Sequence, residues 1–243
     1  MSLRVGIDVD GVLADFKTAF HETSRACLGR RVETLVDPKS AQALEQNDVK
    51  RVWEVVARTP NWWMTLKPYE PEQIARLYSL TRAAGWEVFF LTNRPGSAGD
   101  SVQFQTQSWI EGQGFYMPAV LTIPGSRGEV ANGLRLNLVI DDLLLNCIEV
   151  VSASTAKALL LLRRAEPGLE QHALQRGIGV VPRLEEAIDI TQRLQDLLPT
   201  RKGRLLRLTD WFAPQPAEGA HPAAEPLPDN PRLSRPLPPV GGR

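Results

Sequence analysis

The fold is decided by the stretch Leu3-Arg4-Val5-Gly6-Ile7-Asp8-Val9-Asp10-Gly11-Val12, near the start of the chain. Its apolar part, Arg4–Val9, is short and rich in Val and Ile, which predicts a strand buried on both faces of a sheet. Two aspartates lie at its carboxyl end, and Gly11 after them permits a sharp turn. Because ligands of open α/β sheets bind at the carboxyl ends of strands, this strand end predicts a functional site.

Five further apolar runs of similar length predict five more strands, and helical patterns separate them. The strands are predicted at Glu87–Leu91, Ala119–Ile123, Asn137–Ile140, Ala158–Leu162 and Ile178–Val181. The helices are predicted from Pro71 to the residue before Gly85 and at Ser101–Gly112, Gly128–Leu134, Leu145–Val151, Leu169–Arg176 and Leu184–Leu197. This alternation indicates an α/β fold with a Rossmann-like parallel sheet and helices on both faces.

A small helical cap is predicted between the first strand and the rest of the core. Residues 17–67 contain no strand pattern, and Val49, Val52, Trp53 and Val56 have the spacing of one helix face. Because the insertion follows the first strand directly, we expect it to stand over the carboxyl edge of the sheet as a lid. Residues 1–16 and 68–200 then form the core.

Beyond the core we expect a basic connector at residues 201–213 and a proline-rich, disordered tail at residues 214–243. The tail holds 9 of the 19 prolines and few large aliphatic residues, so it cannot bury enough apolar surface to offset its ordering entropy. The segment Pro236-Leu237-Pro238-Pro239 could bind a polyproline-recognising partner, and a solvated tail is the alternative.

Composition excludes several classes of protein. The 28 basic and 28 acidic residues balance, so we expect neither a nucleic-acid polymer nor a membrane surface as a partner. Two cysteines cannot build a disulfide framework or a zinc-finger pattern, and no apolar run approaches the 18 residues of a membrane span. The amino terminus does not have the pattern of a signal peptide. We expect a soluble, cytoplasmic protein.

Polar side chains follow three other predicted strands, in Leu91-Thr92-Asn93-Arg94, in Pro124-Gly125-Ser126-Arg127-Gly128 and in Ile140-Asp141-Asp142. All these strand ends point to one edge of a parallel sheet. Four carboxylates there cannot all stay ionised without a cation or shared protons, and oxygen ligands without His or Cys favour Mg²⁺. Thr92, Asn93 and Arg127 supply donors for a phosphate, although Arg94 or Arg135 could reach the pocket in place of Arg127.

Four segments resemble the ordered motifs of haloacid dehalogenase (HAD) superfamily phosphatases: residues 8–16, Leu91–Asn93, Ser126–Glu129 and Ile140–Asp142. The resemblance runs from about residue 3 to 165, and the insertion resembles the helical cap of that superfamily. Within it, the string of residues 10–16 and the pair Asp141-Asp142 followed by Asn146-Cys147 are similar to 5′(3′)-deoxyribonucleotidases. The turn Leu143-Leu144-Leu145 departs from the polar turn of those enzymes.

The resemblance implies a Mg²⁺-dependent phosphomonoester hydrolase that acts through an aspartyl phosphate on a nucleoside monophosphate. Asp8 would be the nucleophile and Asp10 the general acid and base. Mg²⁺ would be held by Asp8, the Asp10 carbonyl and Asp142, with Asp141 in support. Thr92, Asn93 and Arg127 would bind the phosphoryl group. The alternatives are a phosphatase of another small phosphorylated metabolite, or a non-catalytic binding protein that uses the cap and the proline-rich tail.

Three aromatic residues have two readings each. Trp62 and Trp63 close the insertion, and either they stack on a substrate ring or they pack in the cap and its hinge. Phe16 follows the first motif; the resemblance places it against a substrate ring, and core packing is the alternative. The cap or the tryptophan pair could also form the surface of a homodimer.

Overall fold

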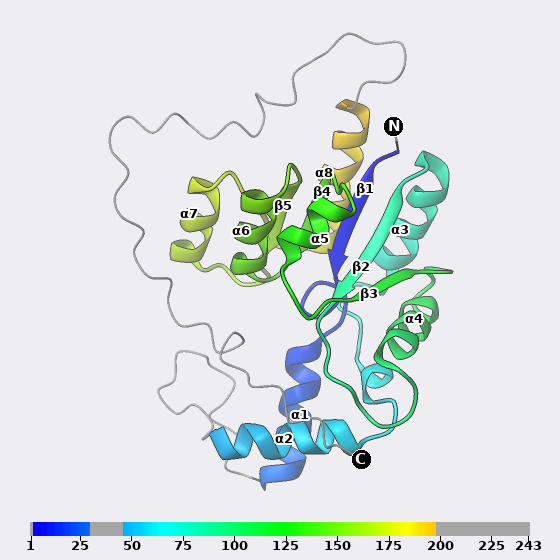
Figure 1. Ribbon diagram of the computed structural model, residues 1–243, viewed down its shortest axis with the longest axis vertical. Helices are drawn as coiled ribbons and strands as arrows, with labels where there is room; N and C mark the ends of the chain where they lie inside the picture. The colour runs from blue at the N-terminus through cyan, green and yellow to red at the C-terminus, as the bar shows by residue number, and fades with distance from the viewer. Residues whose placement is uncertain (1, 30–45, 198–243) are drawn as a thin grey trace.

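The computed structural model describes residues 2–29 and 46–197 (Figure 1). In it, six parallel strands form one sheet in the order β3-β2-β1-β4-β5-β6. The strands are β1 (Arg4–Asp8), β2 (Glu87–Thr92), β3 (Ala119–Thr122), β4 (Leu138–Asp141), β5 (Lys157–Leu161) and β6 (Gly179–Val181). The six predicted runs coincide with these strands to within one residue at either end, and the predicted Rossmann-like α/β fold is confirmed.

Helices cover both faces of the sheet. One face packs against α3 (Pro71–Ala84), α4 (Val102–Gly112) and α8 (Leu184–Leu197), and the other against α5 (Arg127–Gly133), α6 (Leu144–Ala153) and α7 (Pro167–Gln175). Successive residues of β4 alternate between the two faces: Leu138 and Ile140 belong to the first core and Val139 to the second. Every residue of β4 is buried, and the strand is apolar up to its last residue because both of its faces are covered.

The segment that the sequence predicts to be a cap follows β1. It contains α1 (Phe16–Leu28), α2 (Gln46–Arg58) and the short 3₁₀ helix η2 (Trp62–Thr65). Val52 and Val56 of α2 are fully buried, in agreement with their helical spacing. In Figure 1 the carboxyl ends of β1 and β2 point toward α1 and α2, so the cap faces the edge of the sheet at which the predicted site residues stand.

Two chain segments connect the cap to the core and run side by side. The Asp15 N–H donates to the Lys67 carbonyl at 2.8 Å, and the Tyr69 N–H donates to the Leu13 carbonyl at 2.9 Å. The predicted basic connector at 201–213 and the proline-rich tail at 214–243 lie outside the described residues, as does the part of the cap at 30–45. Within the described ranges, no helix has the length and apolarity needed to cross a membrane.

Helices α5 and α6 approach closely at Gly128. A Cβ at this position would lie 2.3 Å from the backbone oxygen of Glu149 and 2.8 Å from the Ala153 Cβ. At Gly133, in the same helix, a Cβ would meet nothing within 4 Å. Only the first glycine is therefore required by packing, and it lies directly after Arg127.

We expect Gly128→Ala to lower the free energy of unfolding by about 1–3 kcal/mol, because the added methyl group must push α5 away from α6. Gly133→Ala is the matched control and should be neutral or stabilising by up to about 1 kcal/mol, since alanine loses less backbone entropy in a helix. Urea unfolding of both variants measures the difference. Equal stability of the two variants would contradict the close approach of the helices.

Candidate active site

Strand ends bring three carboxylates together. Asp8 is the last residue of β1, and Asp141 is the last residue of β4, with Asp142 directly after it. Each of the three offers an oxygen that lies within 4.8 Å of those of the other two. Asp8 and Asp141 are buried, with 6% and 0% of their surface exposed. The pairing of β1 with β4 is what places these oxygens side by side.

The turn after β1 depends on Gly11, whose φ is +95°. A Cβ at this position would lie 2.1 Å from Oδ2 of Asp142, so no larger residue fits without displacing that carboxylate. The turn is closed by the N–H groups of Leu13 and Ala14, which both donate to the Val9 carbonyl. The glycine thus allows the first motif and the acidic pair to share one small space.

Arg127 pairs with the Asp8 carboxylate. Its Nη2 donates to Asp8 Oδ1 at 2.8 Å, and its Nε lies 3.6 Å from Asp141 Oδ2. Arg127 is 5% exposed and begins α5, where its backbone N–H donates to the Glu149 carboxylate at 2.9 Å. Ser126, the N-cap of α5, donates to the same Glu149 oxygen. The guanidinium therefore reaches the site from a helix start that α6 holds in place.

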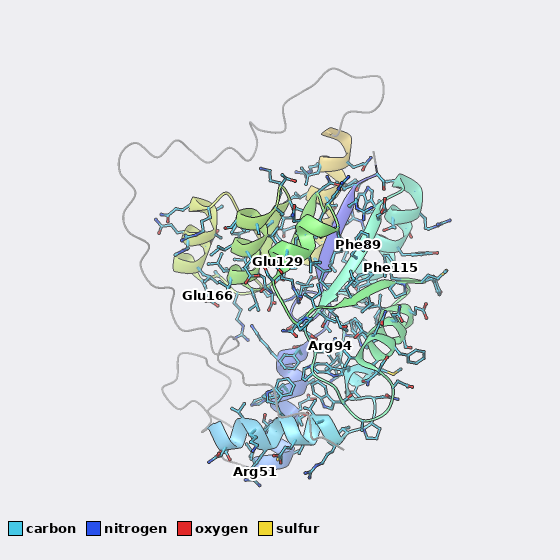
Figure 2. The ribbon with its side chains drawn as sticks, in the orientation of Figure 1. Arg51, Phe89, Arg94, Phe115, Glu129 and Glu166 are labelled. Carbon is cyan, nitrogen blue, oxygen red and sulfur yellow. The ribbon has the colours of Figure 1, made fainter. Side chains whose placement is uncertain are left out.

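Arg94 pairs with Asp10 through two hydrogen bonds. Its Nε and Nη2 donate to the two oxygens of Asp10, each at 2.9 Å, and its Nη1 donates to Thr106 Oγ1 at 2.9 Å. Figure 2 shows Arg94 at the level where the strands end, between the sheet and the cap helices. Sequence reasoning held Arg94 only as a substitute for Arg127, whereas the structure brings both arginines to the site.

The remaining residues proposed from the sequence differ in burial and in their distance from the carboxylates. Thr92 ends β2 and is 1% exposed, with its Oγ1 lying 3.4 Å from Asp10 Oδ2. Asn93, the next residue, is exposed. Arg135, the other alternative to Arg127, is exposed beyond the end of α5 and makes none of these contacts with the carboxylates.

Burial dominates the protonation of the carboxylates. It raises the pKa of Asp8 well above its usual range; the charge of Asp141 raises it further, and Arg127 opposes both effects. Burial also raises the pKa of Asp141 to about 6, against the lowering effect of Arg127. Asp141 accepts hydrogen bonds from the Leu143 N–H and from Asn146 Nδ2, which favour its charged form. These carboxyl groups therefore favour a proton or a cation over unshielded negative charge.

No protein-family model matches the chain, and no curated protein matches it. Its structure is similar to that of a haloacid dehalogenase-like family hydrolase from Streptococcus pneumoniae, with a TM-score of 0.50 and 10% identity over 78% of this chain and 98% of the other. The chain shares the fold of this haloacid dehalogenase-like protein.

Two further solved structures match at slightly lower scores. A hydrolase from Pseudomonas syringae has a TM-score of 0.49 and 12% identity, over 80% of this chain and 99% of the other. The L-2-haloacid dehalogenase from Xanthobacter autotrophicus has a TM-score of 0.49 and 14% identity, over 79% of this chain and 99% of the other. At such identities the likeness concerns the fold, and the chemistry has to be argued from the site.

Aromatic rings fill the junction between the cap and the HAD-like core. Phe16, Trp53 and Trp63 form a triangle of rings: the Phe16 centroid lies 5.9 Å from each tryptophan, and the two tryptophans lie 6.4 Å apart. Trp62 meets Trp63 edge-on at 4.8 Å. Trp62 Nε1 donates to Thr23 Oγ1 and Trp63 Nε1 donates to the Pro95 carbonyl. Phe16, Trp62 and Trp63 are all less than 10% exposed, so these rings pack against protein, whereas Trp53 keeps some exposed surface.

Arg163 is a site residue that sequence reasoning missed. Its guanidinium donates to the carbonyl oxygens of Gly11 and Val12 at 3.2 and 2.7 Å and pairs with Glu70 at 2.8 Å. Arg163 follows the end of β5 by two residues, at the same edge of the sheet. The strand-end rule that selected the other residues would also have found it.

The raised pKa of Asp141 predicts how the metal-free protein responds to pH. The folded protein holds this proton up to about pH 6, whereas an unfolded chain releases it near pH 4. Folding therefore binds a proton between these values, and the stability that this proton contributes is lost as pH rises from about 4 to 6. The loss is expected to be of the order of 1–3 kcal/mol.

Urea unfolding in EDTA over this pH range, for the wild type and for Asp141→Asn, measures the effect. Because asparagine does not titrate, the stability of the variant relative to the wild type should increase with pH. A pH-independent difference between the two proteins would show that Asp141 is not protonated in the folded state.

Proposed function

We propose that the protein is a Mg²⁺-dependent phosphomonoester hydrolase that forms an aspartyl phosphate on Asp8. The observation that carries the proposal is the paired arrangement at the sheet edge. Asp8 lies 2.8 Å from Arg127 and beside Asp141 and Asp142, and Asp10, across a tight turn, is held by Arg94. The HAD-like fold supports a hydrolase, and the four motifs support phosphoryl transfer.

The residues present fit a magnesium ion. The donors are carboxylate oxygens, which Mg²⁺ prefers. Arg127 pairs with Asp8 and Asp141, and Arg94 pairs with Asp10. A divalent cation would add positive charge beside the Asp8, Asp141 and Asp142 oxygens. Asp8 and Asp142, together with the Asp10 carbonyl, would hold the ion. Asp141 would support them, because its oxygens already accept hydrogen bonds from Leu143 and Asn146. When bound, Mg²⁺ would offset negative charge on the phosphoryl oxygens.

Asp8 and Asp10 would act in both chemical steps. In the first step an Asp8 oxygen attacks phosphorus, the bond from phosphorus to the ester oxygen breaks, and protonated Asp10 gives its proton to that leaving oxygen. In the second step water attacks phosphorus, Asp10 takes one of its protons, and the bond to Asp8 breaks to release inorganic phosphate. Arg127 and Thr92 would bind phosphoryl oxygens, with Asn93 at the exposed side.

A nucleoside monophosphate is the substrate that we propose. The similarity of residues 10–16 to deoxyribonucleotidases supports this choice, as does the aromatic cluster around Phe16. Trp53 and Phe20 are the members of that cluster with partly exposed rings, which stand 5.0 Å apart on the cap. A flat base is the type of group that such rings bind. Sugar phosphates are the competing class of substrate, and they need no such rings.

We expect phosphate release from nucleoside monophosphates with Mg²⁺, and no release with EDTA. Asp8→Asn should lower turnover by at least about 1,000-fold, because the amide oxygen is a poor nucleophile. The assay is a panel of nucleoside monophosphates and sugar phosphates, with released phosphate measured directly. A sugar phosphate as the best substrate would retain the chemistry and overturn the nucleotide assignment.

Glu170→Gln, which changes an exposed carboxylate of α7, is the matched control and should keep wild-type turnover. The absence of release from every compound, by folded protein that binds Mg²⁺, would reject the hydrolase. In that case, loss of partner binding on deletion of residues 214–243 would favour a binding protein that works through its tail.

A further inference from the structure

Arg94 is a buried side chain whose guanidinium group is fully paired. Its side chain has no exposed surface, and all three guanidinium nitrogens donate: two to Asp10 and one to Thr106. The guanidinium carbon lies 4.8 Å from the centre of the Trp63 ring, within the range of a cation–π contact. A buried guanidinium is tolerated only when it is paired in this way.

The contact with Arg94 fixes the orientation of the Asp10 carboxylate as well as its distance. A guanidinium that donates to both oxygens of a carboxylate sets the plane of that carboxylate as well as its position, whereas an ammonium ion sets only a distance. The Thr92 hydroxyl, at 3.4 Å from Oδ2, is the longer and weaker contact. The Asp10 side chain is 18% exposed, so the fork of Arg94 is the main restraint that the structure shows on its orientation.

The groups that hold Arg94 are themselves held. Thr106 donates to the Val102 carbonyl at 2.7 Å within α4, and Trp63 donates to the Pro95 carbonyl at 3.0 Å. Arg94 thus links Asp10 to a core helix and to the junction with the cap, and neither support belongs to the loop that carries Asp10. This is how a catalytic carboxyl group would be kept in one orientation before substrate binds.

We propose that Arg94 is a positioning residue, which orients the Asp10 carboxyl group toward the leaving oxygen of the substrate. This inference rests on the proposed hydrolase function. It separates the roles of the two arginines: Arg127, on Asp8, serves the phosphoryl group, and Arg94 serves the acid. The loss on removing Arg94 must then depend on how much the leaving group needs a proton.

The experiment compares two phosphomonoesters in the wild type and in Arg94→Met, Arg94→Lys and Asp10→Asn. A nucleoside monophosphate has a strongly basic alkoxide leaving group, and p-nitrophenyl phosphate has a weakly basic one. We expect Arg94→Met to lower kcat for the nucleotide about 100-fold or more, with KM little changed, and to lower kcat for the aryl ester at least 10-fold less. Arg94→Lys should behave like Arg94→Met, since it keeps the charge and loses the fork.

Two further measurements separate positioning from a general structural role. Adding Arg94→Met to Asp10→Asn should cause little further loss, because both changes remove one function. Guanidinium ion added at millimolar concentration to Arg94→Ala should restore part of the nucleotide activity. This rescue also tests the proposal if Arg94→Met or Arg94→Lys folds poorly. Arg76→Met, which breaks an ion pair between α3 and α8, is the control and should leave both rates unchanged.

Equal losses for both esters in Arg94→Met, accompanied by a raised KM, would overturn the inference and make Arg94 a phosphate ligand. Full activity in Arg94→Met, or the absence of rescue in folded Arg94→Ala, would also overturn it. A wild-type protein that hydrolyses neither ester would reject the proposed function itself, and this outcome is distinct from the others.

Discussion

The repulsion between Asp8, Asp141 and Asp142, whose oxygens stand within 4.8 Å of one another, is the constraint on which the rest of the site depends. Parallel pairing of β1 with β4 forces these oxygens together, and burial removes the water that would screen them. Strand pairing and burial together therefore create a site that favours bound positive charge. Arg127 supplies part of it, and an oxygen-ligated divalent cation is the natural complement.

Arg127 and Arg94 reach the carboxylates of the site from different elements. Arg127 begins α5, which Gly128 lets pack closely against α6, and Glu149 of α6 holds the backbone of that helix start. Arg94 follows β2 and is supported by α4 and by a cap tryptophan. Packing on both faces of the sheet is thus required for the charges to meet, since a displaced helix would leave a buried carboxylate without its partner.

Much of this arrangement could be predicted from the sequence, because it follows from one rule. Parallel strands place their carboxyl ends at one edge, so Asp8, Thr92 and Asp141 were selected by position alone, and the apolar runs located the strands themselves. The partner of each carboxylate could not be predicted in the same way. Arg94 and Arg127 both follow strand ends, and only the packing of α4 and α5 decides which carboxylate each one reaches.

The side-chain partners of the aromatic residues could not be predicted from the sequence either. The sequence places Trp62 and Trp63 at the end of the cap, and a ring there has equal reason to face a ligand or a neighbour. In the structure their indole N–H groups donate to Thr23 and to the Pro95 carbonyl, and the rings lie within the junction. Partners so distant along the chain leave no periodic pattern in the sequence, so spacing could not reveal them.

The loop that carries Asp10 is held from two sides, and these contacts link it to the core and to the segments that lead into the cap. Arg94 binds its side chain from the side of α4, and Arg163 binds the carbonyl oxygens of Gly11 and Val12. Glu70, which pairs with Arg163, also accepts the N–H groups at the start of α8, so the second support is anchored in the core. The segments that enter and leave the cap are hydrogen-bonded to each other within this same region. A cap movement that bends these segments must therefore strain the loop that carries Asp10, unless it is confined to the parts of α1 and α2 beyond the aromatic junction.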